Sequence, residues 1–372
     1  MFFTKKIYDQ LLMNSEELQS KTISWLRFPL AIAIVFHHSV DSTHLREVVS
    51  QINYAHLSGL DICNFFRWLI SDILCRIATS CFCIFSGFLF FYKTKEWNKI
   101  IYFKKVKRKS KTLLLPYVLW NIIPVALMLF YAFIRFDGSL STSMYELYEK
   151  GIYKIFWNFY DGFYPYNIPL WFLRDLIVVA FLSPLVYYFV KYAKIFSLLI
   201  LGFFFYTNFW FPVVSIRALF FFTLGAYFSI HGKNMIMELR KGKWFWYLAT
   251  FITLILSVYF KVNQLNDHFY LFFNLTGCIT TMLIASHLLE RGTVTVNPFL
   301  SKTSFFIFAT HNVLLLWYSI KFLDIILISD TAFILILKYF LAPLICVGLC
   351  LGIYYAAQKT VPKVLAILTG SR

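Results

Sequence analysis

Residues 25–39 read WLRFPLAIAIVFHHS, an apolar run that carries one arginine and two histidines. Arg27 and His38 are eleven positions apart, and at about 100° per residue eleven helical steps return to nearly the same face. The same steps advance about 16 Å, roughly half the thickness of a hydrocarbon core. The spacing predicts a membrane helix that holds the guanidinium at one surface and the His38 imidazole at mid-depth on the same face, so that both side chains border one polar passage.

The composition extends this interpretation to the whole chain. Of the 372 residues, 60% are hydrophobic and 14% are charged, and the mean hydropathy is +0.68. Because the apolar runs are too long and too numerous for a water-soluble chain, we expect an all-α, polytopic membrane protein. The first 20 residues contain no continuous apolar run and no small-residue cleavage site, so we expect no removed signal peptide.

Apolar runs bounded by charged or turn residues predict about ten transmembrane helices. They lie near residues 24–41, 70–92, 112–134, 169–190, 195–211, 216–231, 244–261, 268–289, 304–326 and 334–357. With a cytoplasmic N-terminus, 24 of the 35 Lys and Arg residues fall in cytoplasmic segments, which predicts that both termini are cytoplasmic. The chain then divides into a cytoplasmic N-terminal segment (1–23), a transmembrane domain (24–357) and a cytoplasmic tail (358–372).

Three predicted connections are long: 42–69, 93–111 and 135–168. The first and third face the exterior in this topology and mix polar with aromatic side chains, as sugar-binding surfaces do; an ordinary solvated loop is the alternative. The net charge of +17 reflects cytoplasmic Lys and Arg rather than a nucleic-acid partner. The seven cysteines fall mostly inside apolar segments, so we expect neither a disulfide framework nor a metal site.

His38 is the first candidate for catalysis. Histidine supplies a general base near neutral pH, and an ionisable ring inside a membrane is costly enough to indicate a function. His37 points about 80° away on the helix and is the weaker candidate. The structural alternative for His38 is a histidine hydrogen-bonded to a neighbouring helix.

Cations near the predicted cytoplasmic surface form the second group of candidates. Arg27 is either an anchor at the lipid headgroups or a bidentate ligand for phosphate. The stretch FKKVKRKSKTLLLPYVLW, residues 103–120, places six cations before Pro116. Such a run sets topology, attracts anionic lipid or, beside Arg27, receives a polyphosphate. Arg108 and Lys111 are therefore candidate phosphate contacts.

Several secondary candidates lie inside the predicted helices. Arg174 and Asp175 are neighbours in sequence that are not expected to face each other, so each needs another partner. Ser86 and Gly87 permit close helix packing or line a channel. His311 is expected to meet His38, to line a channel or to pack against a carbonyl. The secondary candidates are His311, Arg76, Arg174, Ser86 and Gly87.

In order and spacing, these segments resemble the membrane-bound acyltransferase-3 family, bacterial integral-membrane enzymes that mostly O-acetylate cell-surface carbohydrates. Arg27 and His38 reproduce its Arg-(ten residues)-His signature. Later segments that resemble its blocks are FSGFLF (85–90), KRKSKTLLLPYVLW (107–120), PLWFLRDLIV (169–178), LFFFTLGAY (219–227) and ATHNVLLLW (309–317).

The resemblance implies a ten-helix core in the cytoplasmic (inner) membrane and cytoplasmic acetyl-CoA as the acyl donor. It implies that His38 is catalytic, that Arg27 binds the donor and that Arg108 and Lys111 contact its phosphates. The basic block departs from the usual double arginine of the family because it is mostly lysine. The expected partners are a polysaccharide or glycolipid acceptor, membrane lipid and other glycan-assembly proteins.

The sequence leaves several alternatives open. His38 acts either as a base on the acceptor hydroxyl or as a nucleophile that carries the acyl group. The acyl group is acetyl or a longer group such as succinyl. A transporter or flippase for a lipid-linked saccharide or polysaccharide shares the intramembrane charges, although no duplicated halves are evident. A structural subunit of an envelope complex leaves the Arg27–His38 alignment unexplained.

Overall fold

Helices are the regular elements of the computed structural model, which describes residues 14–53, 55–94, 96–135, 139–157, 164–262, 268–329 and 331–371. The helices of the first half are α2 (Ser15–His38), α3 (Ser42–Ser50), α4 (Gly59–Trp68), α5 (Ile77–Phe91), α6 (Lys99–Lys109), α7 (Leu115–Arg135), α8 (Ser139–Lys150), α9 (Trp171–Phe181) and α10 (Ser183–Ala193).

The second half contains α11 (Ile195–Tyr206), α12 (Ile216–Ile230), α13 (Met235–Arg240), α14 (Lys243–Val262), α15 (His268–Glu290), α16 (Pro298–Thr310), α17 (Leu316–Ile326), α18 (Ala332–Thr360) and α19 (Pro362–Thr369). Three segments are π-helical: η1 (Leu69–Leu74), η2 (Ser110–Leu114) and η5 (His311–Leu315). Each joins the α-helices on its two sides into one continuous helix. Two 3₁₀ segments, η3 (Ile152–Phe156) and η4 (Ile168–Leu170), precede α9.

Six of the described helices are long and apolar enough to cross a membrane: Gly59–Phe91, Lys99–Arg135, Lys243–Lys261, His268–Glu290, Pro298–Ile326 and Ala332–Thr360. Two further pairs, α2 with α3 and η4–α9 with α10, bend by 68° and raise the number to eight if each pair is one span. The apolar helices α11 and α12 have only 12 and 15 residues. The all-α membrane architecture is confirmed at this level, and the count of ten stays a prediction.

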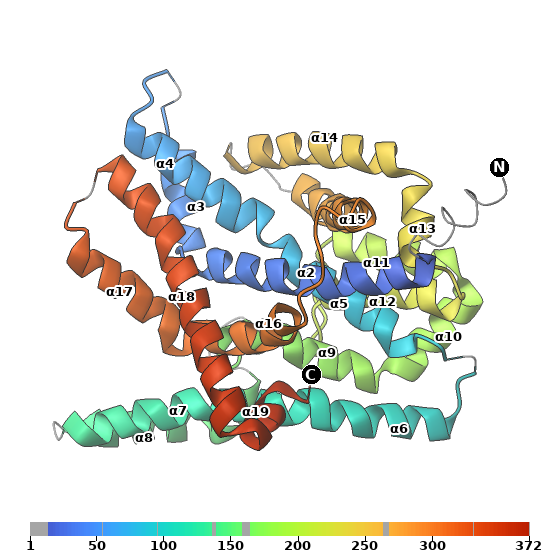
Figure 1. The fold of residues 1–372 in the computed structure, drawn as a ribbon, viewed down its shortest axis with the longest axis horizontal. Helices are drawn as coiled ribbons and strands as arrows, with labels where there is room; N and C mark the ends of the chain where they lie inside the picture. Colours follow the sequence, from blue (N-terminus) through green and yellow to red (C-terminus); the bar gives the residue numbers. More distant parts are fainter. Residues whose placement is uncertain are drawn as a thin grey trace.

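The stretches expected to be long connections are largely helical. Helices α3 and α4 occupy most of residues 42–69, α6 occupies most of 93–111, and α8 lies within 135–168. Helix α6 continues through η2 into α7, and in Figure 1 the two helices form one row along the bottom of the molecule. The polar residues that suggested loops therefore lie on helices that extend beyond the apolar runs.

Two predicted helix boundaries also differ. The span expected at 169–190 is bent, because Pro184 in the first turn of α10 lacks the N–H that a continuous helix requires. Helix α2 begins at Ser15 instead of residue 24. Its polar first turns are stabilised by the Asn14 cap, whose side chain accepts a hydrogen bond from the Glu16 N–H at 3.2 Å.

The centre of the bundle depends on a close crossing of α5 and α12, beside α2 and α16 (Figure 1). A Cβ atom at Gly87 would lie 1.9 Å from the carbonyl oxygen of Phe222, and one at Gly225 would lie 1.9 Å from that of Ile84. The two backbones touch reciprocally, as small residues permit in membrane helices. The close-packing interpretation of Gly87 is confirmed.

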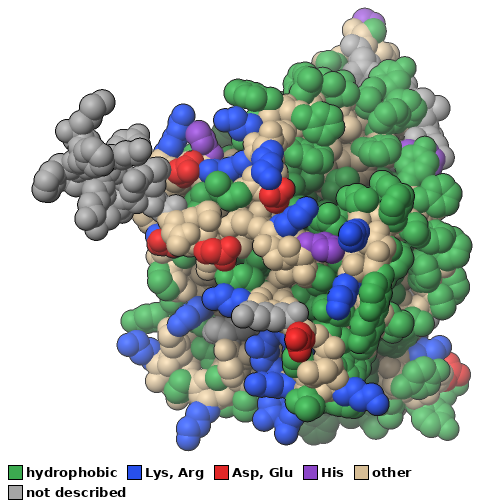
Figure 2. Space-filling model, turned by 90° about the vertical axis from the view of Figure 1, so that its right-hand side faces the viewer, with side chains coloured by type: hydrophobic (Ala, Val, Ile, Leu, Met, Phe, Trp, Pro, Cys, Tyr) green, Lys and Arg blue, Asp and Glu red, His purple; other side chains and the backbone are tan. Residues whose placement is uncertain are grey.

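Apolar and basic surfaces lie on different parts of the molecule. Helix α14 lies at the top edge of Figure 1 and exposes Trp244, Phe245 and Leu248, which are 75%, 65% and 60% exposed. Figure 2 shows Lys and Arg side chains gathered over the face at the right-hand end of Figure 1, with a broad hydrophobic surface beside them. This division suits a protein with a lipid-facing belt and a basic membrane surface.

The two ends of the described chain are packed rather than free. Near the start of α2, the Ser15 carbonyl accepts a hydrogen bond from Asn234 at 2.9 Å. Near the end of α19, the Leu368 carbonyl accepts one from the Trp120 indole at 2.9 Å. Residues 362–369 of the expected tail therefore form a helix against α7. The first contact joins two segments that the charge count assigns to the cytoplasmic side, and the second joins the expected cytoplasmic tail to the predicted span 112–134.

Candidate functional site

Arg27 and His38 line two different pockets along α2. The Arg27 pocket, named for its first residue, has a volume of about 340 Å³. The His38 pocket has a volume of about 370 Å³. Among the described residues, Phe308 of α16 lines both pockets. The sequence predicted a single polar passage bordered by both side chains, whereas the structure has two pockets with an aromatic ring at their boundary.

The Arg27 pocket combines four cations with apolar walls. Its cations come from three helices: Arg27 from α2, Arg108 and Lys109 from α6, and Lys302 from α16. No Asp or Glu lines it within the described residues, and Arg27 forms no hydrogen bond or ion pair with any of them. Its apolar wall residues include Phe82, Phe85, Phe172, Leu173, Leu176 and Phe305. This arrangement suits a ligand with phosphate groups and a long, less polar arm.

Two of the predicted residues behave differently around this pocket. Ser86 lines it, while Gly87 faces α12 as described above. Lys111 is exposed and is not among the lining residues. At about 100° per residue, Arg108, Lys109 and Thr112 share one helix face, and Lys111 lies to one side of it. Ordinary helical spacing was therefore the signal available in the sequence.

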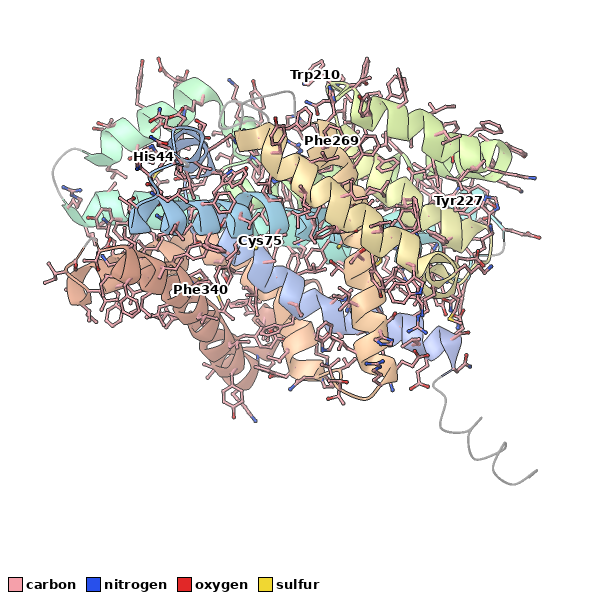
Figure 3. The ribbon with its side chains drawn as sticks, turned by 90° about the horizontal axis from the view of Figure 1, so that it is seen from above. His44, Cys75, Trp210, Tyr227, Phe269 and Phe340 are labelled. Atoms are coloured by element: carbon pink, nitrogen blue, oxygen red, sulfur yellow. The ribbon has the colours of Figure 1, made fainter. Side chains whose placement is uncertain are left out.

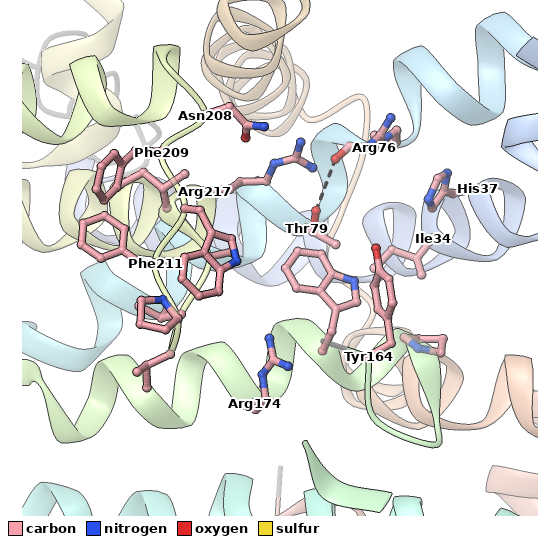
Figure 4. Close-up of a pocket in the computed structure, with 18 of the residues that line it drawn as sticks. Ile34, His37, Arg76, Thr79, Tyr164, Arg174, Asn208, Phe209, Phe211 and Arg217 are labelled. Carbon is pink, nitrogen blue, oxygen red and sulfur yellow. Dashed lines mark hydrogen bonds between the residues drawn. The ribbon is translucent and has the colours of Figure 1, made fainter. Parts of the chain in front are cut away.

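The His38 pocket brings together His37, His38 and three arginines from separate helices. Figure 4 shows Arg217 of α12 and Arg174 of α9 reaching into it from opposite sides, with Arg76 next to η1 near His37. Aromatic rings form much of its wall: Tyr164, Trp171, Phe209, Trp210 and Phe211. Figure 3 shows Trp210 at the edge of the molecule, and its side chain is 63% exposed. Rings and hydrogen-bonding cations together suit a polar ligand with flat faces.

Three histidines meet at the end of α2. The His38 ring centroid is 4.9 Å from that of His37 and 5.3 Å from that of His311. The Nδ1 of His37 is 2.9 Å from the Ser71 carbonyl, and the Nδ1 of His311 is 3.0 Å from the Ile307 carbonyl. His311 therefore contacts His38 and is also bonded to a carbonyl, but it is buried and is not among the residues that line the His38 pocket.

His38 differs from its two neighbours in its hydrogen bonding. Carbonyl oxygens only accept, so His37 and His311 carry their proton on Nδ1 when neutral. His38 forms no hydrogen bond with any described residue, and its ring borders the pocket. Its ring nitrogens are therefore available for a proton transfer or a nucleophilic attack on a bound ligand.

Each of the three π-segments lies beside candidate residues. Segment η1 ends just before Arg76, η2 follows Arg108, and η5 begins at His311. Extra residues in π-turns re-aim side chains, and such turns occur often at functional sites.

Asp72 orients Arg76 and was not among the predicted residues. Its carboxylate is 1% exposed and contacts Arg76 Nη1 at 3.1 Å, Arg46 Nη2 at 3.1 Å and Lys261 Nζ at 3.4 Å. The four-residue spacing of Asp72 and Arg76 on one helix is the signal that was available in the sequence. The other two contacts come from distant parts of the chain.

The expectation that Arg174 and Asp175 do not face each other was wrong. Arg174 donates from Nε and Nη2 to Asp175 Oδ1 at 3.0 and 2.7 Å. The long arginine side chain folds back along the first turn of α9, where the next residue is within reach. Asp175 Oδ2 also accepts a hydrogen bond from the Ser215 N–H at 3.0 Å. Asp175 thereby fixes both Arg174 and the start of α12, which carries Arg217.

Comparisons with known proteins identify relatives over nearly the whole chain. The acyltransferase-3 family model, described as an acyltransferase domain, matches residues 21–355. The succinoglycan biosynthesis protein ExoH of Rhizobium meliloti (strain 1021) is similar, with 26% identity over 388 aligned residues. That alignment covers 95% of this chain and 92% of the relative. No solved structure gives a significant match.

Proposed function

This chain belongs to the acyltransferase-3 family, and on that premise we propose that it moves an acetyl or similar acyl group from cytoplasmic acetyl-CoA to a hydroxyl of an envelope or extracellular carbohydrate. The relative's role in succinoglycan biosynthesis supports a carbohydrate acceptor. The observation that carries the proposal is the pair of pockets along α2: Arg27 without a counter-ion in one, His38 without a hydrogen bond in the other, and Phe308 in both.

The Arg27 pocket is the proposed donor site. Phosphate groups of acetyl-CoA bind Arg27, Arg108 and Lys302, because charge-assisted hydrogen bonds to phosphate are the strong ones. The less polar pantetheine arm lies against the wall that includes Phe85 and Leu173. Lys111 contributes from the surface through its charge alone, since it does not line the pocket.

Phe308 is the proposed gate between donor and acceptor. Its ring lies 5.5 Å from that of Phe172, edge to face, and both side chains are buried. The arm of the donor displaces the Phe308 ring, and the thioester then reaches His38. An apolar ring at this point also keeps water from the donor when the acceptor is absent.

His38 carries the chemistry by one of two routes. In the first, its imidazole takes the proton of the acceptor hydroxyl as the oxygen attacks the thioester carbonyl, and coenzyme A leaves as a thiolate that is then protonated. In the second, a ring nitrogen attacks the carbonyl, coenzyme A leaves, and the acyl-imidazole passes its acyl group to the hydroxyl. Detection of an acyl-histidine by rapid quench distinguishes the second route from the first.

The proposed setting is the cytoplasmic (inner) membrane with both termini inside and His38 about 16 Å deeper than Arg27. The basic face in Figure 2 supports this orientation, because Lys and Arg accumulate at the cytoplasmic surface. Membrane lipid covers the apolar belt, and other glycan-assembly proteins are candidate partners that bring the acceptor to the outer pocket.

The experiment that tests this function is acyl transfer by the purified full chain in lipid nanodiscs, with radiolabelled acetyl-CoA and isolated envelope glycan. His38→Ala is expected to lower transfer by about 10²–10⁴-fold without loss of membrane insertion. His287→Ala, at an exposed position of α15, is the matched control and is expected to retain transfer. Wild-type protein that moves saccharide between leaflets but never acylates it would instead establish the transporter alternative.

A further inference from the structure

Arg217 is the arginine of the His38 pocket for which no described residue is a hydrogen-bond or ion-pair partner. It lies in the first turn of α12, and its guanidinium points into the pocket in Figure 4. It forms no hydrogen bond or ion pair with any described residue. Arg76 and Arg174, by contrast, each contact a buried carboxylate. The structural roles that explain those two arginines therefore do not explain Arg217.

The charges around the pocket leave a positive surplus. The cations are Arg46, Arg76, Arg174, Arg217 and Lys261, and the carboxylates that face them are Asp72 and Asp175. Five cations against two carboxylates leave a surplus of three among the described residues. No Asp or Glu of the described chain lines the pocket itself. A half-enclosed surplus of this kind is costly unless a ligand supplies the missing negative charge.

The start of α12 adds to this preference. Ser215 and Ile216 line the pocket together with Arg217, so the positive end of the 15-residue helix α12 faces the same space. The Asp175 contact to the Ser215 N–H holds this end in position. The pocket therefore offers the Arg217 guanidinium, two further arginines held in position by carboxylates, and aromatic walls beside His38.

We propose that the His38 pocket binds an anionic group of the substrate, a carboxylate or a phosphate, through Arg217. This inference rests on the proposed function and names the substrate class of that same site. The anion has two sources: the far end of the transferred acyl group, as in a succinyl donor, or an acidic sugar of the acceptor. Both bring the same charge to the same guanidinium, in the pocket that His38 also lines.

The first experiment measures binding without any transfer. The full chain in nanodiscs is immobilised, and its binding of radiolabelled succinate, glucuronate, glucose 6-phosphate and glucose is measured. Arg217→Gln is expected to weaken binding of at least one of the three acids about tenfold or more and to leave glucose unchanged. Arg217→Lys keeps the charge and is expected to retain part of the acid binding. Arg240→Gln, on α13 and bonded to Glu290, is the control.

The second experiment separates the two sources. If the anion belongs to the acyl group, Arg217→Gln lowers transfer from succinyl-CoA at least tenfold relative to acetyl-CoA, and succinate is the acid whose binding weakens. If it belongs to the acceptor, transfer to acidic glycan falls relative to neutral glycan with either donor, and glucuronate or glucose 6-phosphate binding weakens. Either pattern supports the proposal.

Two results bear on the proposal in opposite ways. Wild-type protein that binds the acids no better than glucose, or Arg217→Gln protein that binds them unchanged, overturns it; equal thermal unfolding of the variants ensures that misfolding is not the cause. Arg217-dependent acid binding by a wild-type protein that never transfers an acyl group supports this site and contradicts the proposed acyltransferase reaction instead.

Discussion

The two pockets along α2 are both cationic, but they hold their charge in different ways. In the Arg27 pocket, Arg108 and Lys302 are exposed, and no carboxylate of the described chain lines the site. In the His38 pocket, Arg76 and Arg174 are each fixed by a buried Asp. Exposed cations of this kind suit the capture and release of a ligand that carries several negative charges. Fixed arginines suit orientation of a reacting group, because their dipoles need no reorganisation during the reaction.

The largest effect is expected on stability when Asp72, the buried carboxylate that contacts Arg76, is replaced. Asp72→Asn leaves Arg46, Arg76 and Lys261 facing a neutral amide, and breaking a buried ion pair costs about 3–5 kcal/mol. We expect thermal unfolding of the nanodisc-embedded protein at a clearly lower temperature. Glu238→Gln, which removes a partner of Lys241 at the surface of α13, is the control with little expected change. Equal unfolding of the two variants would contradict the anchoring role of Asp72.

Loss of Arg27 from the first pocket is expected to weaken binding of the acyl donor. Arg27→Gln removes charge-assisted hydrogen bonds to phosphate worth about 1.5–3 kcal/mol, so the KM for acetyl-CoA is expected to rise about 10- to 100-fold while kcat changes much less. Steady-state kinetics at fixed acceptor concentration give both constants. A fall in kcat at unchanged KM would assign Arg27 to the chemical step rather than to binding. It would contradict the proposal that the Arg27 pocket binds the donor while the His38 pocket orients the reacting group.

The boundary between the pockets is sensitive to the size of one ring. Phe308→Trp is expected to slow acyl transfer about tenfold, because a larger buried ring resists displacement, while acetyl-CoA still binds. Phe308→Ala joins the pockets and is expected to raise hydrolysis of acetyl-CoA by water. Transfer and hydrolysis are measured in the same reaction with labelled donor. Unchanged rates in both variants would show that the donor does not pass this ring.

The smallest effect is expected for two lysines that differ in position. Lys111→Gln, outside the pocket, is expected to change the KM for acetyl-CoA by less than about twofold, as surface charges contribute little. Lys302→Gln, inside it, is expected to raise that KM severalfold. Measurement at low and high salt sharpens the comparison, since screening weakens an exposed charge first. A larger effect at Lys111 would favour the prediction made from the sequence.

Much of the helical architecture follows from local pattern. The apolar runs predicted the helical regions, and Arg27 and His38 lie on one continuous helix, α2, as the eleven-residue spacing assumed. The Ser86-Gly87 pair indicated a close helix contact, which Gly87 makes. These features depend on neighbouring residues within one helix, so periodicity alone is sufficient to find them.

The arrangement of the site depended on contacts that no local pattern encodes. Asp72 meets Arg46 across 26 residues and Lys261 across 189, and Phe308 becomes the boundary of two pockets only through the packing of α16 against α2. The sequence by itself determined which residues share a helix face, because helical geometry repeats every few residues. Only the tertiary structure decided which faces meet, because buried charges and rings are partnered by whichever helices pack beside them.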